Sequence, residues 1–355
     1  MQFHQFSRRH FLRIFSLILF GSILFNLYML FYPTGIAQAR NIAASVSHRQ
    51  FYGTGNTSCV SPPANFDPIK ASASDLAYYG LPQPPETSGP IFDRWLNAVQ
   101  HSKHRECHFT SRHLSTPLNP SNGIEYYGTT PNWSGYVVGN GTQPGFNFVE
   151  GEWNVPCPNS SKTYWASSAA TWIGIGGYND NNGNLVQGGT EIDASVPPPY
   201  DFYMWYENWP IDNMEIATDK PLACKDHMYA LVDYNLTYND ESYIYVNDSS
   251  NGYYISEHSY YTPDMRYAEW IDERVTCPLS NTTYTKLADF NYVQWHFAYA
   301  MPPGQNSSGI GFFTHTQLTM IEKTDNKPLA SPTELFSDGA SYNDNWSAAG
   351  NDNSC

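Results

Sequence analysis

The sequence lacks the short signatures that identify the commonest hydrolases and nucleotide-binding proteins. It contains no Gly-Xaa-Ser-Xaa-Gly elbow, no His-Glu-Xaa-Xaa-His helix and no phosphate-binding glycine loop. Between residues 131 and 355 it has four histidines, none at the spacing of a metal-binding pair. These are His227, His258, His296 and His315. We expect each of them to be a surface or packing residue rather than a metal ligand.

Charged residues are also scarce, at 14% of the chain, whereas aromatic residues make up 16%, including 27 Tyr and 10 Trp. This balance favours half-buried strands over helices. Basic residues are especially scarce beyond residue 131, where eight accompany 27 acidic residues and give a net charge of −19. Residues 1–39 have a net charge of +3, and residues 40–130 have a net charge of +1. Such an acidic body repels phosphate backbones, so the sequence argues against nucleic-acid binding.

The six cysteines show none of the two-residue spacings of a zinc or redox motif. Two of them, Cys59 and Cys107, precede residue 131, and four follow it, namely Cys157, Cys224, Cys277 and Cys355. We therefore expect disulfides formed in an oxidising compartment. They can close within each part of the chain, although the four cysteines of the body allow three connectivities.

The first 39 residues predict export from the cytoplasm. Arg8 and Arg9 precede an apolar run over residues 14–32, and Ala37-Gln38-Ala39 follows as a cleavage site. The paired arginines resemble a twin-arginine export signal. Because the apolar run is close to the length of a membrane span, an uncleaved anchor is the alternative. In either case we expect the body outside the cytoplasm, secreted or anchored to a membrane through its leader.

Residues 40–130 differ from the rest of the chain because they are rich in Pro, Ser and His. They contain Pro62-Pro63 and one predicted helix from Ile91 to about Cys107. We interpret them as a prosegment that inhibits the body and is removed by a cut between about residues 113 and 131. A flexible spacer is the alternative.

Residues 131–327 consist of short apolar and aromatic alternations separated by Gly, Asn, Asp and Pro turns. The alternating segments are Trp133 to Val138, Phe146 to Val155, Tyr229 to Tyr238, Tyr243 to Asn247, Tyr292 to Tyr299 and Gly311 to Met320. This pattern predicts an all-β domain, an antiparallel β-sandwich of two large sheets. Residues 328–355, rich in Asn, Asp and Ser, are expected to form a loosely held tail.

Two polar residues are candidates for chemistry. Glu269 lies among aromatic residues, and if its segment is a strand, Glu269, Ile271 and Glu273 share one face. A carboxylate in such surroundings should have a raised pKa, which suits proton transfer. Gln187 precedes two glycines, so a substrate backbone can approach its amide closely. Taken alone, each residue is more simply read as a polar residue of a strand.

Six short stretches in combination resemble the glutamic peptidases, or eqolisins. In order they are Asn132 to Tyr136, Gly151 to Pro156, Thr171 to Gly176, Leu185 to Gln187, Trp205 to Pro210 and Ala268 to Ile271. The resemblance runs from about residue 132 to 275, with a weaker continuation to about 322. It does not cover the leader, the prosegment or the tail.

The resemblance implies a sandwich with its cleft on one concave sheet face, and it implies roles for the two candidates. Glu269 would act as general base and then general acid, and the amide of Gln187 would stabilise the oxyanion. Five residues would line the substrate cleft: Trp172, Glu191, Trp205, Glu207 and Trp209. No metal or cofactor would be needed. The expected partners are protein or peptide substrates and the chain's own prosegment, and a monomer is expected.

The sequence departs from the family pattern at three positions where family members tend to carry Asp. These positions hold Gly176, Glu191 and Tyr203. The departures affect the expected subsite preference and pH optimum but not the catalytic pair.

Two other classes remain as alternatives: a β-sandwich glycoside hydrolase, and a non-catalytic carbohydrate-binding surface protein. Against the glycoside hydrolase, Asp272 is three residues from Glu269 and should face away from it.

Overall fold

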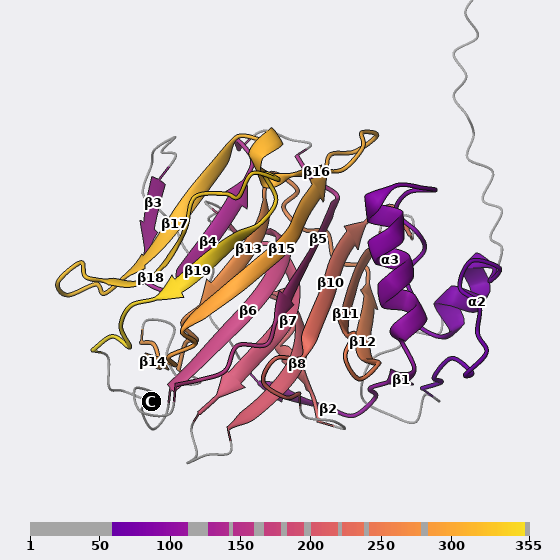
Figure 1. The fold of residues 1–355 in the computed structure, drawn as a ribbon, viewed down its shortest axis with the longest axis horizontal. Helices are drawn as coiled ribbons and strands as arrows, with labels where there is room; N and C mark the ends of the chain where they lie inside the picture. The colour runs from indigo at the N-terminus through magenta and orange to yellow at the C-terminus, as the bar shows by residue number, and fades with distance from the viewer. Residues whose placement is uncertain are drawn as a thin grey trace, which may run out of the picture. The chain divides into compact units, whose positions relative to one another are not determined.

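Strands dominate the computed structural model, as the aromatic-rich composition predicts (Figure 1). The structure describes residues 59–112, 127–141, 145–159, 167–178, 183–194, 200–218, 222–237, 241–277 and 283–351. All of them belong to one unit of residues 51–355. The predicted leader and residues 40–58 and 113–126 of the predicted prosegment lie outside the described residues.

The helices are α2 (Ala73–Tyr78) and α3 (Pro90–His101), with a 3₁₀ turn η1 (Ile310–Phe312). The strands are β1 (His104–Arg105), β2 (Phe109–Arg112), β3 (Tyr127–Thr130), β4 (Trp133–Val138), β5 (Phe148–Asn154), β6 (Ser167–Gly176), β7 (Leu185–Asp193), β8 (Asp201–Trp209), β9 (Met214–Ala217), β10 (His227–Tyr234), β11 (Ser242–Asp248), β12 (Tyr253–Ser259), β13 (Ala268–Glu273), β14 (Lys286–Leu287), β15 (Tyr292–Met301), β16 (Ser308–Gly309), β17 (His315–Ile321), β18 (Pro328–Pro332) and β19 (Tyr342–Trp346). Within the described ranges, neither helix is long and apolar enough to span a bilayer.

Hydrogen bonds join the described strands into one continuous sheet. Its spatial order is β1, β12, β11, β10, β5, β15, β19, β18, β17, β4, β13, β6, β7, β8, β9 and β2. Most pairs are antiparallel, but β1 with β12, β3 with β17 and β14 with β6 are parallel. The predicted β class is therefore confirmed, whereas the structure has a single mixed sheet in place of two antiparallel ones.

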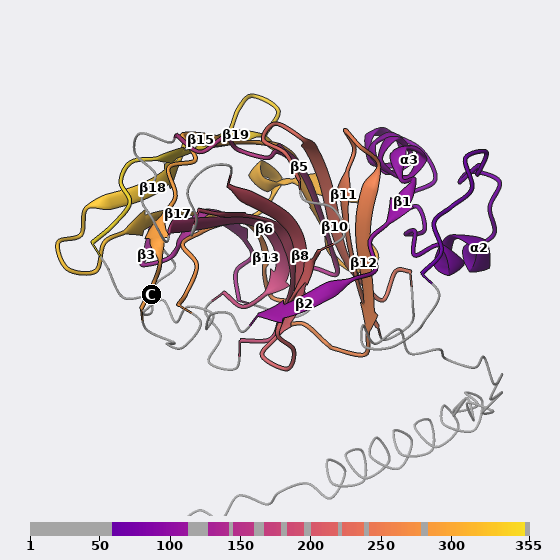
Figure 2. The same ribbon diagram turned by 90° about the horizontal axis from the view of Figure 1, so that it is seen from below.

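The sheet curls so that two groups of its strands face each other across the main core (Figure 2). Alternate residues point inward, because side chains alternate between the two faces of a strand. Val149 of β5, Val232 of β10 and Ile244 of β11 belong to the same buried cluster as Ile173 of β6 and Val186 of β7. The opposite face of β6, β7 and β8 is therefore turned away from this core.

The segment expected to be a loosely held tail is ordered sheet over residues 328–346. β18 pairs with β17, and β19 pairs with both β18 and β15. Leu329, Ala330 and Tyr342 are buried in the main core. The expectation of a loose tail is wrong here, because these few apolar residues suffice to bury two strands. The ordering of this segment also explains why there is a single sheet: β18 and β19 connect the two groups of strands that face each other across the main core.

Residues 59–112, here called the N-terminal layer, are ordered: α2 and α3 lie against the outer face of β10, β11 and β12, whereas β2 pairs with β9 (Figure 1). α3 begins at Pro90, a residue suited to a first helical turn, and buries Trp95 and Val99 on one face. These side chains pack on Tyr229 and Tyr245 of the sheet. Such packing does not fit a flexible spacer.

The predicted helix over residues 91–107 ends early, at His101. Beyond it, the backbone amides of Lys103 and His104 donate hydrogen bonds to the carbonyl of Gly252. The chain then pairs with β12 as β1. Extended pairing with the sheet edge thus replaces the last turns of the predicted helix.

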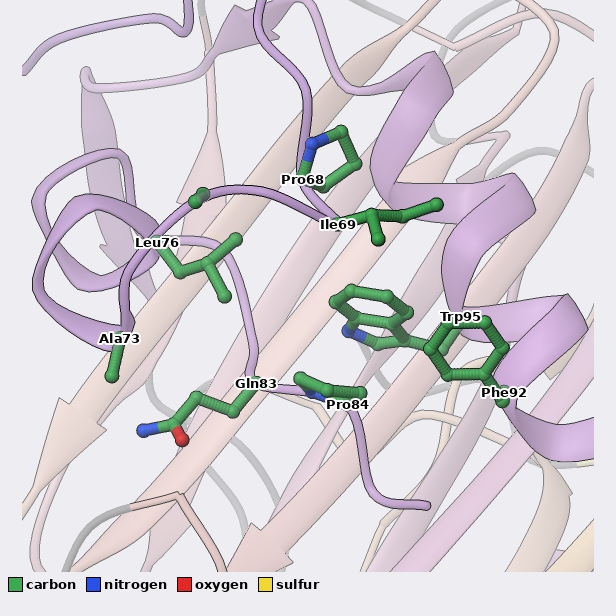
Figure 3. Close-up of a pocket in the computed structure, with 9 residues that line it drawn as sticks. Pro68, Ile69, Ala73, Leu76, Gln83, Pro84, Phe92 and Trp95 are labelled. Atoms are coloured by element: carbon green, nitrogen blue, oxygen red, sulfur yellow. The ribbon is translucent and has the colours of Figure 1, made fainter. Parts of the chain in front are cut away.

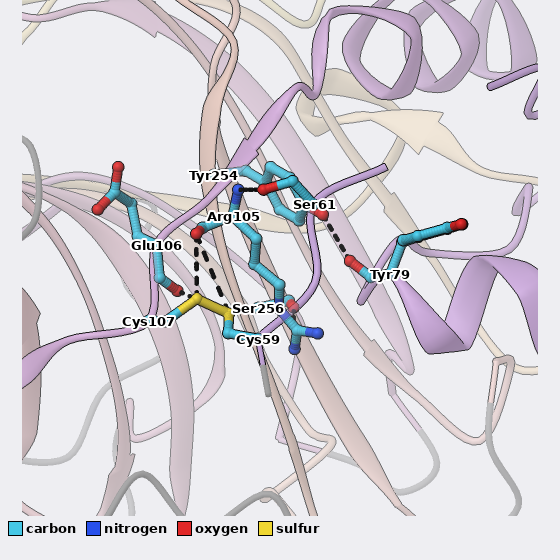
Figure 4. The surroundings of a disulfide bond; sticks show 8 residues. All are labelled: Cys59, Ser61, Tyr79, Arg105, Glu106, Cys107, Tyr254 and Ser256. Carbon is cyan, nitrogen blue, oxygen red and sulfur yellow. Dashed lines mark hydrogen bonds between the residues drawn. A yellow bond between two sulfur atoms is a disulfide. The ribbon is translucent and has the colours of Figure 1, made fainter. Parts of the chain in front are cut away.

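Two described disulfides close within their own parts of the chain, as expected. Cys59 bonds to Cys107 within the N-terminal layer, beside Arg105 and Tyr254 (Figure 4). Cys157 bonds to Cys224 within the body. Cys277 is disulfide-bonded as well.

Candidate active site

The two predicted catalytic residues lie on either side of one glycine in the middle of the sheet. In the strand register, Glu269 of β13 is opposite Gly174 of β6, and Gly174 is opposite Gln187 of β7. Residues in register point to the same face, so both side chains project from the face turned away from the main core. Two strand spacings separate their backbones by roughly 10 Å. Gly174 itself puts no side chain between Glu269 and Gln187, and Leu185 and the Trp172 ring lie 2.8 and 3.1 Å from where its Cβ would be.

Glu269 is fully buried, and neither of its carboxylate oxygens has a hydrogen-bond partner among the described residues. Burial raises the pKa of Glu269 well above its ordinary value, and the charge of Asp264 adds to the shift. The backbone amide of Tyr178 opposes the shift without completing a regular hydrogen bond. A raised pKa at this position was predicted. Its complete burial was not, since a half-buried face was expected.

Gln187 is held by a neighbouring carboxyl group. Its Nε2 donates a hydrogen bond of 2.7 Å to Oε2 of Glu207, the residue opposite it on β8. Burial raises the pKa of Glu207 well above its ordinary value, as does the charge of Glu273. Glu207 therefore retains its proton to higher pH than an exposed glutamate. The hydrogen bond fixes the Gln187 amide and leaves its second N–H available.

Several buried polar atoms on this face have no hydrogen-bond partner within the described ranges. They are both oxygens of Glu269, Oε1 of Gln187, Oε1 of Glu207, and the indole nitrogens of Trp133 and Trp205. Unpaired buried polar groups are costly and uncommon in folded proteins. Their concentration along one face indicates a place where water or a ligand completes the hydrogen bonding.

The predicted cleft tryptophans line the same face. In the strand register, Trp172 of β6 and Trp205 of β8 flank Gly189 of β7. Gly189 is two residues along β7 from Gln187, so it points to the same face of the sheet. The indole of Trp172 donates a hydrogen bond of 2.8 Å to Glu273. Trp209 is in the same buried cluster. The structure thus brings Trp172, Trp205 and Trp209 to the same face as Glu269 and Gln187.

Glu191 also lies on this face, four residues along β7 from Gln187. It is buried and forms an ion pair with Arg112 of the N-terminal layer. Burial raises the pKa of Glu191, while Arg112 counteracts the shift. The last of the predicted cleft residues is therefore in place, but its carboxylate is already occupied.

Asp272 faces the other way, as its position three residues after Glu269 predicts. Its carboxyl accepts hydrogen bonds from Thr171 and from the indole of Trp295. Asp344 lies beside it, and burial raises the pKa of both groups. Asp272 therefore belongs to the main core and does not form a second carboxylate beside Glu269.

Sequence reasoning missed two contributors to this face. Gly174 was noted only as part of a motif, although its position between the catalytic strands is what separates the pair. Glu273 was placed on the correct face without a role, and it accepts hydrogen bonds from Trp172 and Asn132. The signal for Glu273 was its spacing of four residues from Glu269, which keeps both on one strand face.

A pocket lies elsewhere, within the N-terminal layer. It has a volume of about 170 Å³ and is lined only by residues of the N-terminal layer, including Leu76, Phe92 and Trp95 (Figure 3). None of its lining residues carries an ionisable side chain. Within the described ranges no cluster of His, Cys, Asp or Glu is suited to a metal ion either.

A buried carboxyl group and an amide held by a neighbouring carboxyl group thus lie on one aromatic-lined strand face. Comparison with known proteins specifies the class of protein. The model of the Peptidase A4 family matches residues 131–340. Because this match spans more than half of the chain, the chain belongs to that family, the eqolisins, and is a glutamic-type peptidase.

Solved structures agree on the fold. Two crystal structures of scytalidoglutamic peptidase, one with a peptide-based transition-state analogue and one with a transition-state analogue inhibitor, are similar to this chain with TM-scores of 0.50 and 17% sequence identity. Each comparison covers 61% of this chain and 98% of the other. SCP-B, an eqolisin solved with the tripeptide Ala-Ile-His, has a TM-score of 0.48 at 17% identity over the same shares. No curated protein sequence matches the chain.

Proposed function

We propose that this protein is an exported, acid-active endopeptidase in which Glu269 activates the attacking water and Gln187 stabilises the oxyanion. The observation that carries the proposal is the placement of both side chains on one face across Gly174. In that gap a peptide carbonyl meets a carboxyl group on one side and an amide donor on the other. Trp172, Glu191, Trp205, Glu207 and Trp209 line the substrate cleft.

The chemistry requires Glu269 to change its protonation state twice. As a carboxylate it takes a proton from water while the water oxygen attacks the peptide carbonyl. The carbonyl oxygen becomes negatively charged and accepts a hydrogen bond from the free N–H of Gln187. The protonated Glu269 then gives its proton to the departing amine. A raised pKa suits this second step, because it makes the acid form of Glu269 readily available.

The experiment that tests this assignment compares Glu269→Gln and Gln187→Ala with the parent on a quenched peptide at acid pH. Loss of proton transfer should lower kcat of Glu269→Gln by about 10²–10⁴-fold or more. Loss of one oxyanion donor should lower kcat of Gln187→Ala by about 10²–10³-fold. Glu269→Gln should melt at or above the parent temperature at neutral pH, because a neutral amide replaces a buried carboxyl group.

Glu257→Gln is the matched control. Glu257 is a half-buried glutamate of β12 whose pKa burial raises to about 8, but it lies beside Tyr206 rather than beside Glu269 and Gln187. Its variant should keep parental turnover. Near-normal hydrolysis by a folded Glu269→Gln or Gln187→Ala protein would overturn the assignment. Inhibition of the parent by a chelator or a serine-directed reagent would point to different chemistry.

We also propose that residues 40–130 act as an inhibitory prosegment. Support comes from two basic side chains of the N-terminal layer that reach buried carboxylates of the body: Arg94 pairs with Glu150 and Arg112 with Glu191. As pH falls, protonation of the body's carboxyl groups weakens such attraction. The precursor should therefore process itself in acid between about residues 113 and 131. Equal activity of the full precursor at neutral and acid pH would contradict this.

Export remains a proposal based on the leader. Arg40 should be the first residue of the exported protein, because it follows Ala37-Gln38-Ala39. N-terminal sequencing of the protein recovered outside the cytoplasm measures this directly. Recovery of an intact residue 1 in a membrane fraction would replace cleavage with anchoring.

A further inference from the structure

Two buried carboxyl groups meet in the main core, on the face of β13 opposite to Glu269. Asp272 of β13 is 1% exposed, and Asp344 of β19 is fully buried. The two side chains are hydrogen-bond partners, although their strands are not neighbours in the sheet. The contact therefore crosses the core and joins β19 to the strand that carries Glu269. These two residues are here called the core carboxyl pair.

Hydrogen bonds to the core carboxyl pair leave one oxygen atom without a donor. Thr171 donates to Oδ1 of Asp272 at 2.6 Å, and the indole of Trp295 donates to Oδ2 at 3.0 Å. Ser134 donates to Oδ1 of Asp344 at 2.7 Å. Oδ2 of Asp344 accepts from no N–H or O–H group of the described residues. Two carboxyl groups can hydrogen-bond to each other only through a proton, so the proton belongs on Oδ2 of Asp344, from which it is donated to Asp272.

The described groups around the core carboxyl pair supply no positive charge. The titratable groups that face it are Tyr342 of β19 and Tyr136 of β4, and because burial raises the pKa of both tyrosines, they stay neutral. β4, β6 and β15 otherwise contribute the three uncharged donors. Burial and mutual repulsion raise the pKa of both carboxyl groups. Since one proton serves both groups, the pair keeps at least one proton to a pH well above the ordinary carboxyl range.

A second contact between β19 and β13 lies beside the core carboxyl pair. The hydroxyl of Tyr342 donates a hydrogen bond of 3.0 Å to the carbonyl oxygen of Trp270. Tyr342 precedes Asp344 by two residues and Trp270 precedes Asp272 by two, so the contacts follow one another along the two strands. Trp270 directly follows Glu269. Separation of β19 from β13 would therefore disturb the segment that positions Glu269.

We propose that the core carboxyl pair holds β19 against β13 in acid and separates them as the pH rises, which inactivates the enzyme. While the pair keeps a proton, it forms a hydrogen bond across the core. When that proton is released to solvent, two carboxylates remain in contact, repel each other and move apart. This event lies in the core and is distinct from the ionisation of Glu207 on the opposite face. The inactivation rests on the proposed peptidase function, whereas the separation of the strands does not.

Hydrogen exchange of the full chain tests the separation without catalysis. Exchange is followed by mass spectrometry between about pH 5 and pH 8 and is corrected for the intrinsic rate at each pH. Peptides that cover β19 and β13 should lose protection at lower pH than those that cover β10 and β11, because the repulsion begins at the core carboxyl pair. Protection of β19 and β13 that persists until β10 and β11 also open would overturn the proposal.

Two asparagine variants distinguish the members of the core carboxyl pair. In Asp344→Asn, the amide Nδ2 replaces the protonated oxygen and donates to Asp272 at every pH. This variant should fold in acid, and its β19 should lose protection about one pH unit higher than in the parent. Asp272→Asn instead directs an N–H toward the donor Thr171 or Trp295, so it should be less stable than the parent at every pH.

Glu257→Gln is the matched control. Burial raises the pKa of Glu257 on β12 to about 8, but Glu257 lies beside Tyr206 and outside the core carboxyl pair. Its β19 should therefore lose protection at the parental pH. The same parental pH in Asp344→Asn, or equal stability of the two asparagine variants, would overturn the proposal. If Asp344→Asn does not fold, the exchange profile of the parent decides between these outcomes.

A pH–rate profile of the acid-processed enzyme tests the inactivation. In Glu207→Gln the amide beside Gln187 cannot ionise, so the remaining alkaline limb should come from the core carboxyl pair. Adding Asp344→Asn to this variant should move that limb upward by about one further pH unit. An unchanged limb would refute inactivation by the pair and leave the peptidase function standing. A folded enzyme that cleaves no peptide at any pH would instead refute the proposed function, and hydrogen exchange would still decide whether the strands separate.

Discussion

At the scale of single residues, the protonation of Glu269 and Glu207 governs the expected pH dependence. Glu269 must be ionised to act as a base, so its raised pKa places the acid limb of kcat/KM above the ordinary carboxyl value of about 4.5. Glu207 should stay protonated beside Gln187, and because its pKa is raised, the enzyme should remain active to higher pH. The optimum is therefore expected above about pH 4.5.

A pH–rate profile of the parent and of Glu207→Gln checks this expectation. Since the amide of the variant cannot ionise, its alkaline limb should move to higher pH while its acid limb stays in place. An activity that still rises below about pH 3 would show that burial does not control Glu269 as described.

The gap at Gly174 gives a second prediction at this scale. A methyl group there would lie 2.8 Å from Leu185 Cδ1 and 3.1 Å from the carbonyl oxygen of Val186, directly between the catalytic side chains. Gly174→Ala should lower kcat/KM by about 10²-fold, because small displacements of catalytic groups are costly. Gly311→Ala, where the nearest contact of the new methyl group is 3.3 Å, is the control. Unchanged kinetics of Gly174→Ala would show that the reaction does not occupy this gap.

The sequence was most informative about residues that carry side-chain chemistry. The resemblance named Gln187, Glu269, Trp172, Trp205 and Trp209 as site residues, and the structure brings them to one face; strand alternation by itself related only Glu269, Ile271 and Glu273. It could not reveal the ion pair of Arg112 with Glu191, since the two residues are 79 positions apart and meet only through the pairing of β2 with β9. Contacts of that kind depend on which strands pair in the sheet, and the local sequence pattern does not encode this pairing.

At the scale of elements, the same reasoning explains why the last strands were missed. β18 begins and ends with proline, and β19 reads Tyr-Asn-Asp-Asn-Trp, a composition typical of loops. Asp344 of β19 is nevertheless buried, and Ser134 donates a hydrogen bond to it at 2.7 Å. The hydrogen-bond partners of such a strand's polar residues are distant in sequence. From sequence alone the strand is therefore mistaken for an unstructured tail.

The attachment of α3 depends on one buried ion pair. Arg94 donates to Glu150 through Nε at 3.1 Å, and Tyr229 donates to the same carboxyl group at 2.8 Å. Arg94→Met should therefore cost about 3–5 kcal/mol of unfolding free energy at neutral pH, because Glu150 is left as an uncompensated buried charge. The cost should shrink in acid, where Glu150, whose pKa burial already raises to about 7, takes up a proton instead.

Denaturant unfolding near pH 7 and near pH 4.5 measures both effects. The double variant Arg94→Met, Glu150→Gln should recover most of the loss, since it removes both charges. Lys70→Met, which removes an exposed pair with Asp67, should leave stability unchanged. A loss from Arg94→Met that is independent of pH would indicate lost packing rather than an uncompensated charge.

At the scale of the whole molecule, buried carboxyl groups should make the fold most stable in acid. Burial raises the pKa of Asp233 and Asp272 to about 6, of Glu150 to about 7 and of Glu257 to about 8. A carboxyl group whose folded pKa is raised stabilises the protein fully below its unfolded value, near 4. This contribution is lost as pH rises through about 6 to 8, while the net charge of −15 adds self-repulsion.

Thermal melts between about pH 4 and pH 8 should therefore show a melting temperature that falls steadily as pH rises. The few aspartates whose pKa is lowered lie at the surface, where solvent screens their opposite effect. A higher melting temperature at pH 8 than at pH 5 would contradict the expected balance.

The N-terminal layer has a consequence for the form of the mature enzyme. Its disulfide, Cys59–Cys107, closes entirely on one side of the expected cut, so no described covalent bond would tie the layer to the body after cleavage. Trp95 and Val99 nevertheless remain packed on the tyrosines of β10 and β11, and Arg94 stays buried against Glu150. Cleavage alone would thus give a two-chain protein that migrates as one species under native conditions and as two after denaturation. Maturation in this molecule would be the loosening of a single strand, β2, within a complex that otherwise stays assembled.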